Sequence, residues 1–259
     1  MVEHPQINAA DGHILPTIHY KHGARKLVVA SHGITSEKTE GGIYTTFAES
    51  ILASNFDVLL FDFRGHGDSP ISSKDTTVSG EILDLMAVFR WARAQGYSSI
   101  QLVAASFGAS ILLLAASQYD IKFLTSVVLW NPVISYETTF IRASVSWGRT
   151  FFDQTETDEL AYRVETWIPD SSFAISAQMT QELLFFHPEL TVWPWQVPLL
   201  VFHGSSDTLV PWQDAKNYVD RCVSSSHMEF NLVSGVDHGF EDQLQSVMCN
   251  TSNWLLKHS

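Results

Sequence analysis

The sequence predicts an α/β fold: a mostly parallel central sheet with helices on both faces and an inserted helical cap. Short buried strands alternate with amphipathic helices along most of the chain, which is typical of this class. The length of 259 residues fits one large domain. Residues 133–197 contain no clear strand where the alternation should continue. We therefore expect a core of residues 1–132 and 198–259 and a cap of residues 133–197.

The hydrophobic pattern places the elements of the core in order. Segments 5–8 and 14–20 flank the turn signal Asp11-Gly12 and predict two antiparallel strands at the start of the sheet. A helix over 79–95 follows from apolar positions with a period of 3.6 residues, and Ser79 is its expected N-cap. The other expected strands are 26–31, 57–62, 99–104, 124–130, 198–204 and 230–233, and the other expected helices are 43–53, 107–117, 211–222 and 241–257.

One apolar run, residues 102–109, changes from strand to helix at Ser106. A nucleophile held on such a sharp turn needs small residues two positions before and two positions after it. These residues are Ala104 and Gly108, whereas the commoner form has glycine at both places. Because a serine hydroxyl is a weak nucleophile, the turn predicts a general base beside Ser106.

Two later residues complete a catalytic triad. Asp207 follows the expected strand 198–204, and His238 lies in the loop after the expected strand 230–233. The carboxyl ends of parallel strands meet at one edge of a sheet, so we expect both side chains near Ser106. The sequence thus predicts Ser106 as nucleophile, His238 as general base and acid, and Asp207 as the residue that orients His238.

Two backbone N–H groups are expected to bind the negative oxygen that forms during attack. One belongs to Phe107, the residue after the nucleophile, at a helix N-terminus. The other belongs to Ile34, in the loop Ser31-His-Gly-Ile-Thr35 that follows a strand. Loss of one such donor typically costs about 3 kcal/mol of transition-state stabilisation.

Other motifs carry weaker signals. Asp237 adjoins His238, but adjacent side chains on a loop rarely face the same way. Segment 62–69 is rich in glycine, yet it lacks the spacing of a dinucleotide-binding loop and predicts a structured turn. Cys222 and Cys249 predict buried or half-buried thiols and no disulfide framework. No acidic or cysteine partner lies at metal-ligand spacing from the closest histidines, so we expect no metal and no cofactor.

Charge and hydropathy limit the partners. The net charge of −13 argues against nucleic acid, because no basic stripe is present to neutralise phosphates. No apolar stretch is long enough to span a bilayer, and residues 1–12 lack the apolar core of a signal peptide. We expect a cytoplasmic protein that acts on a small molecule. The sequence does not decide between a monomer and a homodimer.

The expected cap is rich in aromatic and acidic residues. Its nine acidic and three basic residues give it a charge of −6. It contains six phenylalanines and half of the tryptophans, Trp147, Trp167, Trp193 and Trp195. Two interpretations stay open: these side chains line an apolar acyl or aromatic pocket, or they build the small core of the cap itself.

Several motifs together resemble the α/β-hydrolase superfamily. They are Ser31-His-Gly, Asp62-x-Arg-Gly-His-Gly-x-Ser69, the turn at Ser106, His203-Gly-x-x-Asp207 and Asp237-His-Gly-Phe240. The resemblance covers nearly the whole chain outside residues 133–197 and implies the α/β-hydrolase fold with a serine mechanism. Size and cap position are similar to bacterial cinnamoyl and feruloyl esterases, which implies carboxylic ester substrates.

The residues around Ser106 are also similar to the bacterial luminescence acyl-carrier thioesterases. That similarity implies long-chain acyl thioesters as substrates. The chain differs from those enzymes in its His32-Gly33 pair and in its acidic cap.

Three functions stay open. The favoured one is a serine hydrolase that cleaves carboxylic esters or thioesters with an apolar or aromatic acyl group through an acyl-enzyme on Ser106. The second is an acyltransferase or acyl thioesterase acting on carrier-bound fatty acyl groups. The third is a ligand binder with a hydrolase fold and no turnover, which the intact triad disfavours.

Overall fold

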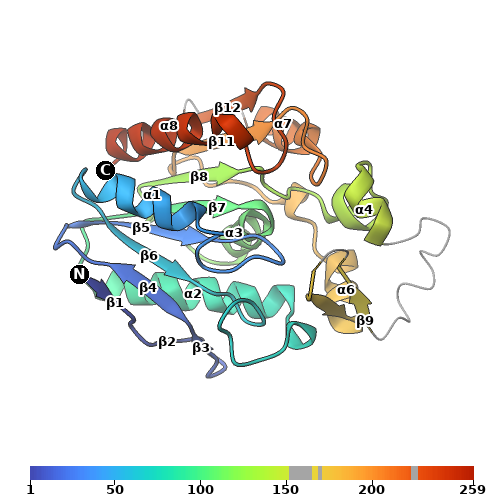
Figure 1. The fold of residues 1–259 in the computed structure, drawn as a ribbon, viewed down its shortest axis with the longest axis horizontal. Helices are drawn as coiled ribbons and strands as arrows, with labels where there is room; N and C mark the ends of the chain where they lie inside the picture. Colours follow the sequence, from blue (N-terminus) through green and yellow to red (C-terminus); the bar gives the residue numbers. More distant parts are fainter. Residues whose placement is uncertain (152–164, 169–170, 223–226) are drawn as a thin grey trace.

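The computed structural model describes residues 1–151, 165–168, 171–222 and 227–259, and its centre is one eight-stranded sheet (Figure 1). The strand order is β1-β4-β6-β5-β7-β8-β11-β12. These strands are β1 (Val2–Glu3), β4 (Thr17–Tyr20), β5 (Lys26–Ser31), β6 (Asp57–Phe61), β7 (Ser99–Ala105), β8 (Ser126–Trp130), β11 (Leu199–Gly204) and β12 (Met228–Val233). Neighbours from β6 to β12 pair in parallel, which confirms the predicted mostly parallel sheet.

Helices surround this sheet along the chain. They are α1 (Ile43–Leu52), α2 (Val78–Ala94), α3 (Ser106–Gln118), α4 (Ser146–Phe151), α6 (Ala177–Phe185), α7 (Trp212–Arg221) and α8 (Leu244–Lys257). Single helical turns are η1 (Ser73–Asp75), η2 (Glu137–Ile141), η3 (Pro188–Leu190) and η4 (Glu241–Gln243). Figure 1 shows both termini at one end of the molecule and α4, α6 and β9 at the other, toward which the arrows of β7 and β8 point.

The core consists of two layers, one on each face of the sheet. Successive residues of a strand point to opposite faces, so a strand that is covered on both sides is apolar throughout. In β5, Val28 and Ala30 pack with α1 and α8, whereas Leu27 and Val29 pack with α2 and α3. This arrangement explains the continuous apolar runs from which the strands were predicted.

The antiparallel start of the sheet differs in detail from the prediction. β1 and β4 form the antiparallel edge of the main sheet. The segments around the Asp11-Gly12 turn, β2 (Ile7–Asn8) and β3 (Ile14–Leu15), pair separately as a small hairpin. Pro5 and Pro16 separate these strands from β1 and β4, because proline has no N–H to continue a ladder.

The N-cap of helix α2 is Thr77, two residues before the predicted cap, and the helix begins at Val78. The Thr77 backbone is extended, and its hydroxyl accepts a hydrogen bond from the N–H of Gly80. Ser79 lies inside the first turn, where its N–H donates to Glu182 at 2.9 Å. The prediction of Ser79 as the cap is therefore wrong, since two cap-forming residues compete at this position.

Residues 133–197 do contain strands, contrary to the expectation. β9 (Glu165–Trp167) pairs antiparallel with β10 (Ala174–Ser176). Each strand has three residues, which is too short for an alternating pattern to stand out in the sequence.

Two smaller expectations concern the thiols and the membrane. Cys222 is half-buried, but Cys249 is exposed, so the expectation of a buried thiol is wrong for Cys249.

Among the helices of the described ranges, none is long and apolar enough to cross a bilayer.

Glu81, on α2, is a carboxyl group enclosed by the protein. It is 1% exposed, and neither of its oxygens has a hydrogen-bond partner among the described residues. Oε1 lies 3.9 Å from Nδ1 of His66, but burial together with the nearby His32 lowers the pKa of His66 to about 3. Burial and the charge of Asp84 raise the pKa of Glu81 well above its ordinary value. In the folded protein, Glu81 therefore stays a neutral carboxylic acid to a higher pH than in the unfolded chain.

We expect Glu81→Gln to raise the free energy of unfolding at pH 7 and to flatten its pH dependence. The unfolded chain loses this proton near pH 4.5, whereas the folded chain keeps it. Stability therefore falls as pH rises above 4.5, by up to about 1.4 kcal/mol per pH unit, until the folded pKa is reached. Glutamine has no proton to lose. Denaturant unfolding between pH 5 and 8 measures the difference, with the exposed Glu49→Gln as control. Parallel curves for the parent and Glu81→Gln contradict the assignment.

Candidate active site

Ser106 lies at the junction of β7 and α3 in a left-handed backbone conformation, with φ of 49°. A non-glycine residue in this region carries about 1–3 kcal/mol of strain. The turn is closely packed, because a Cβ added to Gly108 would lie 2.5 Å from the carbonyl oxygen of His32. Ala104 is fully buried. The small residues on either side of Ser106 are thus required by the space around the turn.

Asp207 holds His238 by a direct hydrogen bond. The ring Nδ1 of His238 lies 2.7 Å from Oδ2 of Asp207. The other oxygen of Asp207 accepts from the N–H groups of Leu209 and Val210, both at 2.8 Å. The carboxylate is thereby fixed from the protein side. With Nδ1 bound to a carboxylate, Nε2 is the ring nitrogen left to exchange a proton.

The charges around His238 outweigh its burial. Burial alone lowers the pKa of an imidazole, but the hydrogen bond and the charge of Asp207 raise it, and the charges of Glu40 and Asp237 add to this effect. The net result is a His238 pKa above its ordinary value of 6.5. The ring is therefore a stronger base than a free histidine.

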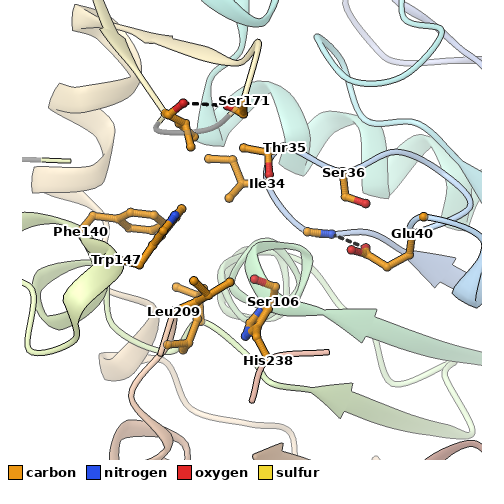
Figure 2. A pocket seen from close by; sticks show the side chains of 15 residues that line it. Ile34, Thr35, Ser36, Glu40, Ser106, Phe140, Trp147, Ser171, Leu209 and His238 are labelled. Carbon is orange, nitrogen blue, oxygen red and sulfur yellow. Dashed lines mark hydrogen bonds between the residues drawn. The ribbon is translucent and has the colours of Figure 1, made fainter. Parts of the chain in front are cut away.

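Ser106 and His238 line the same cavity, which has a volume of about 360 Å³. Figure 2 shows both side chains facing it, with Ile34, Thr35 and Ser36 along another side. Its apolar lining is Val133, Phe140, Trp147, Ile168, Leu209 and Val210. The cavity thus has an apolar part and a polar part, and the serine and histidine face both.

The two residues expected to supply N–H groups occupy different positions. Ile34 lines the cavity. Its loop passes directly over the serine, since a Cβ added to Gly33 would lie 2.9 Å from Cβ of Ser106. Phe107 begins α3 next to Ser106, but its side chain is buried and stacks on Tyr136 with ring centres 5.5 Å apart. Phe107 is therefore a core residue beside the cavity and is not among the described residues that line it.

The weaker motifs have structural partners. Both oxygens of Asp237 contact Thr208, and Oδ1 also accepts from the backbone N–H of His238, so this carboxylate holds the loop rather than the imidazole. In segment 62–69, Asp62 binds Lys38, and Arg64 forms ion pairs with two further aspartates. Across the described part of the chain, no three or more His, Cys, Asp or Glu side chains are grouped as a metal site requires.

Asn131, which was not predicted from the sequence, connects two parts of the site. It follows β8 with a φ of 44°, a conformation that asparagine tolerates better than most residues. Its Oδ1 accepts from the N–H of Gly204 at 2.8 Å, and its Nδ2 donates to the carbonyl oxygen of His238. In the sequence, the pair Asn131-Pro132 indicates only that a strand ends there.

The family of the chain follows from a comparison with family models. A model described as serine aminopeptidase, S33, matches residues 22–159, which is more than half of the chain. The chain belongs to this family of α/β-hydrolases. The resemblance to the α/β-hydrolase superfamily is thereby confirmed.

Several solved structures have the same fold as this chain. Est1E from Butyrivibrio proteoclasticus, solved with ferulic acid bound, has a TM-score of 0.81, an identity of 18% and coverage of 98% of both chains. The Pyrococcus furiosus esterase Pf2001 has a TM-score of 0.73 and an identity of 21%, over 100% of this chain and 93% of its own. GrgF, an α/β-hydrolase from Penicillium sp. sh18, has a TM-score of 0.76 and an identity of 17%, over 100% and 99%. Among curated proteins, none matches the sequence significantly.

We expect Asp207→Asn to lower the pKa of His238 by about one pH unit or more, because it removes the nearest negative charge and keeps the acceptors for Leu209 and Val210. NMR titration of the imidazole measures this value in the absence of any substrate. The matched control is Asp237→Asn, which removes a charge from the loop of His238 and should lower the pKa less. Equal shifts in the two variants would contradict the assignment.

Proposed function

We propose that this protein is a serine hydrolase that cleaves carboxylic esters or thioesters with an apolar or aromatic acyl group through an acyl-enzyme on Ser106. The observation that carries the proposal is the shared cavity, which joins a serine on a strained turn to a histidine held by an aspartate. Two findings support it: membership of the S33 family, and the likeness to the esterase Pf2001 and to Est1E with its bound ferulic acid.

The proposed mechanism has two half-reactions. Nε2 of His238 takes the Ser106 proton as the hydroxyl oxygen attacks the acyl carbonyl, and Asp207 stabilises the imidazolium through Nδ1. The N–H groups of Ile34 and Phe107 donate to the negative oxygen. His238 then gives its proton to the leaving alcohol or thiol. In the second half, His238 takes a proton from water, whose oxygen attacks the carbonyl carbon of the Ser106 ester. His238 then gives this proton to Oγ of Ser106 as the bond between Oγ and the acyl carbon breaks and the acid is released. Because the pKa of His238 is raised above 6.5, activity should rise with pH through a midpoint above that value.

The apolar part of the cavity is the proposed acyl site. Phe140, Trp147 and Ile168 come from residues 133–197, which we propose act as a cap over the core residues Leu209 and Val210. A cavity of about 360 Å³ suits a small or aromatic acyl group rather than a long chain.

The tryptophans of residues 133–197 divide between the two interpretations left open by the sequence. Trp147 lines the cavity. Trp193 is buried and donates from Nε1 to the carbonyl oxygen of Val197 at 2.7 Å, so it supports local packing. Trp167 and Trp195 are more than half exposed and serve neither purpose.

Ser106→Ala should lower kcat/KM for every cleaved ester by at least about 10³-fold, because it removes the nucleophile and keeps the cavity. A series of p-nitrophenyl esters from acetate to dodecanoate, together with methyl cinnamate and methyl ferulate, measures the effect and the acyl preference. Ser171→Ala, which alters another serine of the same cavity, is the control. The proposal fails if no ester or thioester is cleaved, or if Ser106→Ala is as active as the parent. Product partition with an added alcohol or thiol separates hydrolysis from acyl transfer.

Trp147→Ala should shift the acyl preference toward longer chains, because it enlarges the apolar part of the cavity. We expect the ratio of kcat/KM for p-nitrophenyl octanoate to that for the butyrate to rise by about tenfold. Trp167→Ala removes an exposed tryptophan of the same segment and should leave the ratio unchanged. An unchanged ratio in Trp147→Ala would place the acyl group elsewhere.

A further inference from the structure

The cavity contains a carboxylate that the triad does not use. Glu40 lies on the loop between β5 and α1, and among the described residues that line the cavity it is the only acidic one. Figure 2 shows it across the cavity from Trp147 and Leu209, on the polar side. A carboxylate in this place is costly, because burial disfavours its charge and raises its pKa.

Glu40 is bonded to the loop that passes over the serine. Its Oε2 accepts from the N–H of Gly33 at 2.8 Å, and Figure 2 draws this bond. Gly33 immediately precedes Ile34 and leaves no room for a Cβ against Ser106. The carboxylate therefore fixes the loop at the point where it meets the proposed nucleophile.

The backbone of Glu40 is itself held in an unfavourable conformation. Its φ is 49°, in the left-handed region that favours glycine. Two other residues of the loop have contacts of their own. Lys38 binds Asp62, after β6, at 2.8 Å, and Glu37 accepts from the N–H groups of Thr39 and Gly41 within the loop. Glu40 thus faces the cavity, whereas Glu37 bonds within its own loop.

The charge of Glu40 also acts on His238. The titratable and charged groups around the imidazole are Asp207 at Nδ1, Asp237 on the same loop, His203 on β11, and Glu40 from across the cavity. Burial lowers the pKa of His203 to about 4, so this ring is neutral at ordinary pH. Glu40 favours the imidazolium form of His238, and that positive charge in turn favours the ionised form of Glu40.

We propose that Glu40 is a positioning residue of this site. It fixes the loop of Gly33 and Ile34, which carries a proposed oxyanion donor, and it places a negative charge across the cavity from the catalytic imidazole. The inference rests on the proposed function. Its two parts are separable, because glutamine keeps an acceptor oxygen for Gly33 but has no charge, and alanine has neither.

The test compares Glu40→Gln and Glu40→Ala with the parent. In Glu40→Gln the acidic limb of the kcat/KM profile should move to lower pH by about half a pH unit or more, because the imidazolium loses a stabilising charge. Glu40→Ala should show the same displacement and, in addition, a kcat about tenfold below that of Glu40→Gln with little change in KM, because the loop loses its anchor. The control is Glu37→Gln. Glu37 is a carboxylate of the same loop, but its hydrogen bonds are to Thr39 and Gly41 of that loop, so this variant should show neither effect.

NMR titration of His238 in the parent and in Glu40→Gln gives a second readout that needs no substrate. It should show the same lowered pKa, and it remains valid if Glu40→Ala does not fold. If the parent cleaves no ester or thioester, the proposed function fails while this titration still tests the link between Glu40 and His238. An unchanged His238 pKa in Glu40→Gln, equal kcat in the two Glu40 variants, or an equal shift in Glu37→Gln would overturn the proposal.

Discussion

The register of the parallel strands is the constraint on which the site depends. Ser31 of β5 lies opposite Ala104 of β7, Trp130 of β8 lies opposite Ala105, and Gly204 of β11 lies opposite Val233 of β12. The strands therefore end at nearly the same level, and the loops that follow them begin side by side. A serine, an aspartate and a histidine separated by up to 132 positions in the numbering of the chain meet for this reason.

Hydrogen bonds between these loops convert proximity into a fixed geometry. Asn131 bonds to Gly204 and to the loop of His238, and Asp207 bonds to the imidazole itself. On the opposite side, Glu40 bonds to Gly33. The contacts of Asn131 and Asp207 join the ends of different strands, so this part of the site depends on tertiary structure that no single segment can form alone. The bond between Glu40 and Gly33 instead closes one loop upon itself.

The sequence predicts the parts of this arrangement that have a local signature. The buried strands, the small residues around Ser106, and the placement of Asp207 and His238 after strands follow from patterns a few residues long. Glu40 and Asn131 have no such signature, because their roles come from contacts that appear only in the folded chain. Glu40 bonds to Gly33 across its own loop and faces the cavity of His238, and Asn131 bonds to Gly204. The N-cap of α2 was predicted at the wrong residue for a related reason. Thr77 and Ser79 both have side chains that can cap a helix, and only the backbone conformation distinguishes them. The short strands β9 and β10 are stabilised by pairing with each other, which three-residue patterns do not reveal.

The central claim is that Ser106 forms a covalent intermediate, and the most direct measurement is to locate the modified residue. A fluorophosphonate ester, whose phosphorus is attacked by an activated serine hydroxyl, would be incubated with the protein, and the digest mapped by mass spectrometry. The account predicts one adduct per chain, on Ser106, at a rate that rises with pH as His238 loses its proton. An adduct on another residue, or no adduct in a protein that still cleaves esters, would contradict it.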